Sequence, residues 1–498
     1  MRTLCGSLSP ILAICLTLPA VCFAGPPRGR PSAPNTPAGA QFTALLKAYN
    51  SGDPAIMRRF VAYSYDRALG DSAGTNRRTQ TLYRYYVTRA RSLQPVSFAS
   101  TSQTSLTALL RSPLTEEWTR MQVATTHRAR HLITGVSILP MAAPPTEHKR
   151  RKANAQEVAR EVGRLVGRLA KADAFSGAAL VGYHGKTLYK GAAGLANEAF
   201  HARNTPATRF NLGSLNKMFT GVAILQQVQR GRLSLSDRLG KLLPDFPNAQ
   251  ARQQITLRHL LNHTSGLGDF YTPQFAASAK DRYRTIRDYF PLFARSPLRF
   301  RPGSRFEYNN ADYLALGAIL ERATGQSYES YVRANIYDPA GMKDTAAFEQ
   351  DKDASGLATG YTRIGGPALP SGRRNNLYLH IVRGGPSGGG YSTVEDLNRF
   401  ADALLRFKLL SPEYTNLALT GGVSTPLDGG ARYGLGFMEQ FVRGTRIAGH
   451  TGGFPGMSDQ IDIYPELGVT VIALSNYDPP AAQLITQRAR DLLAGYTR

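Results

Sequence analysis

In the stretch Phe210-Asn-Leu-Gly-Ser-Leu-Asn-Lys-Met-Phe-Thr-Gly221, Ser214 stands three residues before Lys217. The apolar residues that follow recur with a helical period, at Met218, Val222, Leu225 and Val228, and Gly231 ends the run. Residues three apart share one face of a helix, so the lysine amine can reach the serine hydroxyl. A lysine whose pKa is lowered by burial, a nearby cation or the helix N-terminus can take the proton of that hydroxyl. The stretch therefore predicts a nucleophilic serine on a helix, unless this short spacing arises by chance.

The length and the N-terminus of the chain indicate an exported protein of several domains. Its 498 residues suggest two or three domains, and its 42% hydrophobic and 19% charged residues are typical of a soluble globular protein. We interpret residues 1–24 as a secretory signal peptide, because an apolar run from Ile11 to Val21 precedes an exit at Cys22-Phe23-Ala24. The run is too short for a stable membrane span, so we expect a periplasmic or secreted protein. Acylation of Cys22, as in a lipoprotein, is the alternative.

The cysteine and histidine content limits the chemistry that is available. All three cysteines, Cys5, Cys15 and Cys22, lie within the predicted signal peptide, so the mature protein is expected to contain none. This excludes disulfides, thiolate metal sites and a cysteine nucleophile. The nine histidines show no His-x-His or His-Glu-x-x-His spacing, so we expect no metal and no other cofactor. A serine nucleophile therefore remains as the expected basis of catalysis.

The basic charge of the chain does not indicate nucleic-acid binding. The net charge of +25 comes mostly from scattered arginines, with one cluster at Lys149-Arg150-Arg151-Lys152. Scattered charge is typical of a solvated surface, which also favours anionic envelope polymers as partners. No nucleic-acid motif accompanies the charge, so we expect no nucleic-acid partner.

The N-terminal third is predicted to form a separate small domain. Residues 25–40 are rich in Pro, Ala and Arg and are expected to be a disordered leader. From 41 to 141 we expect one helix that ends near Asn50, a second from Ala55 to Ala62, and then strands. The strands are expected at the tyrosines 83, 85 and 86, around Trp118 to Val123, and around Ile133 to Ile138. The order of elements resembles the nuclear-transport-factor-2-like (SnoaL-like) cone fold. Residues 142–155 are the predicted linker.

Residues 156–498 are predicted to form an α+β domain. It opens with a helix that has an apolar face, followed by a hairpin from Ala178 to Lys190. Four strands between Tyr433 and Ser475 and a helix from Ala481 to Leu493 close it. Both ends then contribute to one antiparallel sheet flanked by terminal helices, with a mainly helical lobe, roughly 211–410, inserted between them. A crevice between the sheet and the lobe is where we expect the ligand.

Three further stretches accompany the Ser-x-x-Lys motif. They are Tyr308-Asn-Asn310, the loop Leu260-Leu-Asn-His-Thr-Ser-Gly-Leu267, and Gly449-His-Thr-Gly-Gly453. Three supporting stretches occur as well: Phe175-Ser-Gly177, Asp338-Pro-Ala-Gly-Met342 and Gly390-Tyr-Ser-Thr-Val-Glu-Asp-Leu397. In these motifs and in their order, the chain resembles the serine β-lactamase and D,D-peptidase superfamily. The resemblance is to the branch of class C β-lactamases, D-aminopeptidases, related esterases and penicillin-binding proteins, and it covers about 156–495.

The resemblance implies a role for each motif residue. Ser214 is expected to attack the substrate and become an acyl-enzyme, with Lys217 and Tyr308 as general base and acid. Asn310 is expected to orient Lys217 and the substrate. His450, Thr451, Gly452 and Gly453 are expected to line the substrate and oxyanion side, where the backbone N–H groups of Ser214 and Gly453 would form the oxyanion hole.

One departure from the family pattern bears on the substrate. His450 stands where the family usually has lysine, and it is expected to be mostly neutral at pH 7. Whether β-lactams are hydrolysed or only acylate the enzyme therefore stays open, whereas a D-peptidase, an amidase and a carboxylesterase all fit. The substrate is a small molecule or a peptide, with peptidoglycan-derived fragments as one candidate. The leaving group, the ligand of the N-terminal domain and the oligomeric state stay open.

Two other functions and two other candidate residues also fit parts of the sequence. A catalytically retired envelope-binding protein would use the same cleft, and an anionic-polymer binder would use the basic surface. His263 is expected to be structural, because it lies where a helix ends. Ser387 fits a Gly-x-Ser-x-Gly pattern but lies in a glycine-rich loop, so we interpret it as a loop residue. The stretches Gly266–Phe300 and Asp351–Gly390 are expected to rim the cleft.

Overall fold

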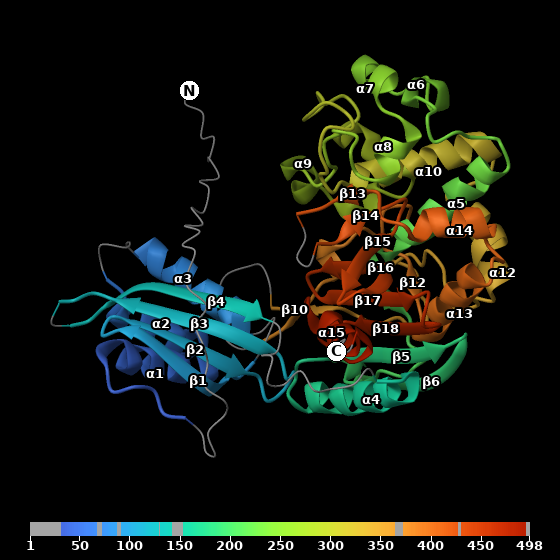
Figure 1. Ribbon diagram of the computed structural model, residues 1–498. Helices are drawn as coiled ribbons and strands as arrows, with labels where there is room; N and C mark the ends of the chain where they lie inside the picture. The colour runs from blue at the N-terminus through green and yellow to red at the C-terminus, as the bar shows by residue number, and fades with distance from the viewer. Residues whose placement is uncertain are drawn as a thin grey trace, which may run out of the picture. The chain divides into compact units, whose positions relative to one another are not determined.

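The computed structural model describes residues 31–66, 72–86, 91–128, 130–141, 153–363, 372–426 and 430–494. The predicted signal peptide and most of the predicted linker lie outside these residues. The chain divides into two compact units, Met1–Tyr83 with Ser92–Thr146, and Arg84–Arg91 with Glu147–Arg498 (Figure 1). Among the described helices, none is both long and apolar enough to cross a membrane.

The first unit contains three helices and one four-stranded sheet. The helices are α1 (Pro37–Asn50), α2 (Pro54–Ser64) and α3 (Ser72–Tyr85). The strands β1 (Gln94–Ser102), β2 (Ser105–Arg111), β3 (Trp118–Thr125) and β4 (Ile133–Met141) form an antiparallel sheet in sequence order. Helix α1 buries Phe42, Leu45 and Tyr49, and the ring of Phe42 lies 5.4 Å from that of Phe98 on β1. This contact joins the first helix to the sheet.

Two predictions for this unit were wrong. Helix α1 begins at Pro37, inside the predicted disordered leader, because the Thr36 hydroxyl accepts a hydrogen bond from the Gly39 N–H at 3.1 Å and proline suits the first helical turn. Tyr83 and Tyr85 belong to helix α3 and not to a strand. In that helix Thr79 and Leu82, three residues apart, are buried, so the helical period overrides the short tyrosine alternation.

The second unit is built on an eight-stranded sheet with the strand order β13-β14-β15-β16-β17-β18-β5-β6. The strands are β5 (Gly177–Tyr183), β6 (Lys186–Ala193), β13 (Val423–Ser424), β14 (Arg432–Tyr433), β15 (Met438–Val442), β16 (Thr445–Phe454), β17 (Met457–Tyr464) and β18 (Val469–Ser475). Every neighbouring pair is antiparallel. Strand β18 pairs with β5, so that Ile472 lies opposite Leu180 and the two ends of the unit meet. This confirms the predicted α+β class and the shared sheet.

Helices cover this sheet at its centre. Strands β17 and β18 are buried at every position, as expected when both faces are covered. Helix α4 (Ala155–Lys171) packs on β5 and β6, and α15 (Ala481–Ala494) packs on β17 and β18 and against α4 (Figure 1). The predicted apolar face of α4 is buried, comprising Val158, Val162, Leu165, Val166 and Leu169. Helix α13 (Val394–Leu405) packs on β5 and β18.

The remaining helices form the inserted lobe, as predicted. They are α5 (Asn216–Gln229), α6 (Leu239–Leu242), α7 (Ala249–Gln254), α8 (Leu257–Leu261), α9 (Pro273–Ala277), α10 (Asn310–Thr324), α11 (Tyr328–Val332), α12 (Asp338–Ala340) and α14 (Pro412–Leu419). Helix α5 is buried at every position from Asn216 to Gln227, so it is the central helix of the lobe. It contacts α10, α11 and α14.

Candidate active site

Ser214 and Lys217 lie together at the start of the central helix. Ser214 belongs to a short 3-10 turn, η4 (Gly213–Leu215), which leads directly into α5. Gly213 has a φ of +47°, a backbone conformation that favours glycine. The Lys217 Nζ lies 3.1 Å from the Ser214 Oγ. The structure thus places the two side chains in hydrogen-bond contact, as the three-residue spacing predicts.

The Lys217 amine is completely buried, with no exposed surface. Besides Ser214, it donates hydrogen bonds to the Asn310 Oδ1 at 2.8 Å and to the Ser387 carbonyl oxygen at 2.6 Å. Burial lowers the pKa of Lys217 to about 7, although the nearby carboxyl groups of Asp269 and Asp312 act to raise it. A large fraction of the amine is therefore unprotonated near neutral pH, which a general base requires.

Asn310 is held in place by Asp269, a residue that none of the sequence motifs marks. Asn310 is the first residue of α10, and its backbone N–H and its side-chain Nδ2 donate to the Asp269 Oδ2 at 3.2 and 3.0 Å. An amide whose nitrogen faces a carboxylate must direct its oxygen the other way, here toward Lys217. Asp269 thus fixes the orientation of the amide. It lies in Gly266–Phe300, the stretch predicted only to rim the cleft.

Tyr308 lies next to the amine and remains accessible. The Lys217 Nζ is 4.8 Å from the centre of the Tyr308 ring, and 37% of the residue is exposed. Desolvation raises the pKa of Tyr308, while its hydrogen bond with the Ser214 side chain acts to lower it. The phenol is therefore protonated at neutral pH, and its hydrogen bond with Ser214 places it where it can pass a proton between that side chain and a substrate.

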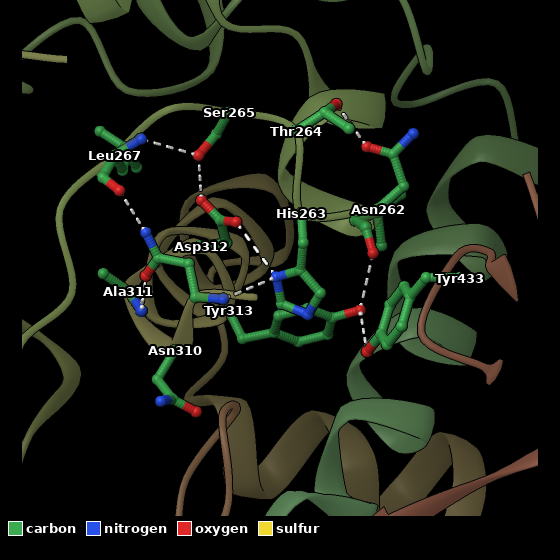
Figure 2. Close-up of polar contacts among 12 residues, drawn as sticks. Asn262, His263, Thr264, Ser265, Leu267, Asn310, Ala311, Asp312, Tyr313 and Tyr433 are labelled. Carbon is green, nitrogen blue, oxygen red and sulfur yellow. Dashed lines mark hydrogen bonds and ion pairs between the residues drawn. The ribbon is translucent and has the colours of Figure 1, made fainter. Parts of the chain in front are cut away.

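A buried polar network supports this side of the site (Figure 2). His263 is fully buried, and its Nδ1 accepts a hydrogen bond from the Asn309 N–H at 3.2 Å and lies 3.2 Å from the Asp312 Oδ2. The Asn309 side chain in turn caps α10 by accepting from the Ala311 N–H at 2.7 Å. Burial lowers the pKa of His263, so its imidazole is uncharged at neutral pH, and burial raises the pKa of the Asp312 carboxyl. These residues hold the start of α10, which positions Tyr308 and Asn310.

The end of strand β16 presents backbone to the site. Its neighbour β15 pairs with it only as far as Gly449, whereas β17 pairs with it through Phe454. From His450 onward, one edge of the strand therefore has no sheet partner among the described strands. A methyl group on Gly213 would lie 3.4 Å from the Gly453 backbone nitrogen, and one on Gly452 would lie 2.4 Å from the Leu212 carbonyl oxygen. The strand thus approaches the turn of Ser214 at a distance that only glycine at 452 permits.

The side chains of His450 and Thr451, both predicted to line the substrate side, make hydrogen bonds within the protein. His450 is 1% exposed, with its Nε2 2.9 Å from the Tyr433 hydroxyl and its Nδ1 2.7 Å from the Thr451 carbonyl oxygen. Burial, together with the nearby Lys217, lowers the pKa of His450 to about 3. The Thr451 hydroxyl accepts from the Gln483 Nε2 at 2.8 Å on the other side of the strand. Alternation along the strand points both side chains away from its free edge.

The glycine-rich loop around Ser387 packs against the turn that carries Ser214 and contacts Lys217. Ser387 lies in a turn, as predicted, and contributes its carbonyl oxygen to Lys217. A methyl group on Gly388 would lie 2.9 Å from the Gly213 carbonyl oxygen, and one on Gly390 would lie 2.7 Å from the Asn216 side chain. The glycines are needed because this loop packs directly on the turn that carries Ser214. In the part of the chain that the structure describes, no group of three or more His, Cys, Asp or Glu side chains could hold a metal ion.

Comparison with known proteins agrees with this fold and site. Residues 162–496 match the Beta-lactamase family, so the chain belongs to that family. Penicillin-binding protein 4* of Bacillus subtilis is 30% identical over 335 residues, which cover 64% of this chain and 73% of that protein. The family includes serine hydrolases.

Solved structures resemble the second unit over nearly their whole length. A penicillin-binding protein from Bacillus halodurans is 30% identical, with a TM-score of 0.59 over 68% of this chain and 99% of that one. A D-stereospecific amidohydrolase from Streptomyces sp. is 25% identical, with a TM-score of 0.56 over 68% of this chain and 97% of that one. These similarities show the penicillin-binding-protein-like fold.

Proposed function

We propose that this chain is an exported serine hydrolase that cleaves an amide or ester bond through an acyl-enzyme on Ser214. The observation that carries the proposal is the buried Lys217 amine, which lies 3.1 Å from the Ser214 hydroxyl. Burying a lysine costs free energy because its charged group loses water, whereas an apolar side chain could fill the same space without this cost. A buried amine with a pKa of about 7 beside a serine is suited to activating that serine.

The hydrogen bonds of Lys217 suit it to act as the base. A neutral amine has two N–H groups and one lone pair, and Lys217 has two carbonyl acceptors, on Asn310 and Ser387. The lone pair is then left for the third neighbour, the Ser214 hydroxyl. As the Ser214 oxygen bonds to the substrate carbonyl carbon, its proton passes to Lys217.

The remaining steps use Tyr308 and the free edge of β16. The oxyanion of the tetrahedral intermediate would be bound by the backbone N–H groups of Ser214 and Gly453. Tyr308 would relay the proton to the leaving amine or alcohol as its bond to the acyl carbon breaks. Water then attacks the acyl-enzyme by the same path in reverse, which releases the acid and returns the proton to Ser214. These steps need no cofactor.

The similar proteins indicate a broad class of substrate and no single compound. D-peptidase, amidase and carboxylesterase activities all fit a family that contains penicillin-binding proteins and a D-stereospecific amidohydrolase. We propose a small-molecule or peptide substrate, with peptidoglycan-derived fragments among the candidates. The predicted signal peptide supports an exported location.

We also propose that the first unit is an NTF2/SnoaL-like module. Its three helices, followed by a four-stranded antiparallel sheet, support this proposal. We assign it no separate activity, because the acid and base groups described above all lie in the second unit.

The proposed function is tested by comparing two serine variants. Ser214→Ala should lower the turnover of a p-nitrophenyl ester by about 1,000-fold or more, because the nucleophile is removed. Ser387→Ala keeps the carbonyl group that Lys217 contacts and should retain turnover within about fivefold. Circular dichroism would establish that both variants are folded. Equal turnover in wild type and Ser214→Ala would contradict the role of Ser214 as the nucleophile. No reaction of the wild type with any ester or fluorophosphonate would instead favour a catalytically retired binding protein.

A further inference from the structure

Three aromatic side chains from separate segments meet beside the candidate site. They are Tyr271, after the loop that follows α8, Phe454, at the end of β16, and His380, in the stretch before the glycine-rich loop. The ring centre of Phe454 lies 6.1 Å from that of Tyr271 and 4.6 Å from that of His380. Tyr271 is 48% exposed, while Phe454 is half-buried and His380 is buried. We call these three residues the aromatic rim.

The rim is joined directly to the residues that surround Ser214. Phe454 follows Gly453, whose backbone lies next to the turn of Ser214. The Asp269 Oδ1 accepts hydrogen bonds from the backbone N–H groups of Phe270, at 2.6 Å, and Tyr271, at 3.4 Å, while its Oδ2 holds Asn310. The same carboxylate therefore positions both the Lys217 partner and the tyrosine of the rim.

The rim is held in place from behind. The ring of Tyr271 stacks on Phe270 at 4.4 Å, and Phe270 packs against Phe275 at 5.1 Å and Tyr289 at 4.9 Å. On the other side, Asn376 donates to the His380 Nε2 at 2.5 Å and to the Pro455 carbonyl oxygen at 2.8 Å. Flat rings that are fixed before binding offer apolar contact area at a low cost in entropy.

The charges around the site do not favour an anionic substrate. His450, which stands in the position of the family's lysine, is buried and uncharged. Burial also lowers the pKa of His380 to about 4, so the rim itself is neutral. The charged group next to Tyr308 and Tyr271 is Asp269, an anion, and the Lys217 amine is enclosed by its own partners. A substrate carboxylate would therefore meet an anion and no free cation among these residues.

We propose that the enzyme acts on uncharged esters or amides that carry an aryl or similarly flat apolar group, which lies against Tyr271 and Phe454. This inference rests on the proposed hydrolase function and adds the substrate class to it. The reaction is ordinary hydrolysis, in which ester or amide and water give acid and alcohol or amine.

Matched methyl esters test the inference, with kcat/KM measured by titration of released acid. Methyl phenylacetate should exceed methyl acetate by about tenfold or more, and methyl 4-carbamoylphenylacetate should exceed methyl 4-carboxyphenylacetate by about the same factor. In Tyr271→Ala and Phe454→Ala the preference for phenylacetate should fall to about threefold or less. Tyr378→Ala, a control at an aromatic residue that is 91% exposed, should leave both preferences unchanged.

Labelling with a fluorophosphonate separates this inference from the proposed function. A wild type that neither labels nor turns over any ester would overturn the hydrolase itself. A labelled enzyme that hydrolyses none of the four esters, prefers the carboxylate, or keeps its aryl preference in both rim variants would overturn only the substrate class. Variants that label at the rate of the wild type are folded, so a lost aryl preference in them is assigned to the rim.

Discussion

Lys217 sets the pH dependence of the proposed reaction. Because its folded pKa is about 7, well below that of a free lysine, its protonated and inactive form accumulates as the pH falls below 7. We expect kcat/KM for a neutral ester to rise with pH along an acid limb with a midpoint near 7 and then to level off. A midpoint below about 5, where carboxylic acids titrate, would show that another group is the base.

Asp269→Asn tests the residue that the motifs do not mark. Loss of the carboxylate frees the Asn310 amide, so we expect kcat to fall by about 10- to 100-fold. The negative charge of Asp269 raises the pKa of Lys217, so its removal should also move the acid limb to lower pH. A merely structural role would lower activity without moving the limb.

Asp281→Asn is the matched control for this variant. Asp281 lies in the same stretch, is exposed, and is not among the groups that shift the pKa of Lys217. Its variant should keep both the activity and the limb of the wild type. If the midpoint of the acid limb of kcat/KM moves equally in both variants, the assigned role of Asp269 is contradicted.

At the scale of the element, alanine substitutions at two glycines of strand β16 test how closely its backbone must approach the turn of Ser214. A methyl group at Gly452 would meet the Leu212 carbonyl oxygen at 2.4 Å, whereas one at Gly453 would come no closer than 3.2 Å, to the Pro479 ring. Gly452→Ala should cost about 1–3 kcal/mol of unfolding free energy and lower kcat/KM by about 100-fold. Gly453→Ala keeps its N–H and should stay within about threefold. Denaturant unfolding and ester kinetics measure both effects, and equal losses in the two variants would contradict this geometry.

Elements with a long, regular pattern were predictable from the sequence. The apolar period of α4, the hairpin of β5 and β6, and the closing helix α15 are confirmed. Helix α4 buries one periodic set of side chains, and β5 is a short strand that is buried continuously from Gly177 to Gly182. The predictions for the start of α1 and for the region of α3 were wrong, because a capping threonine and polar helix residues add little to a hydrophobic pattern.

The candidate site was predictable only where it lies on such elements. The contact of Ser214 with Lys217 follows from helical spacing, and Asn310 is the first residue of helix α10. The contributions of Asp269 and of the Ser387 carbonyl come from irregular loops, whose paths no period encodes. The inward side chain of His450 depends on which face of β16 meets the lobe, which register and not composition decides.

At the scale of the whole molecule, the chain divides into two compact units, so we expect the second unit to fold on its own. It contains the complete eight-stranded sheet, the helical lobe and the residues of the candidate site, and the family match lies within it. A chain of residues 153–498 should be folded by circular dichroism and keep kcat/KM within about threefold of the full chain. An aggregated or inactive fragment would show that the first unit is required.

The central claim is the covalent intermediate on Ser214. The most direct measurement mixes the enzyme with p-nitrophenyl acetate, quenches it in acid within the first turnovers, and maps the mass of its peptides. The account predicts one added acetyl group on the peptide that contains Ser214, and no adduct there in Ser214→Ala. An acetyl group on another residue of the wild type, with Ser214 unmodified while the ester is hydrolysed, would contradict it.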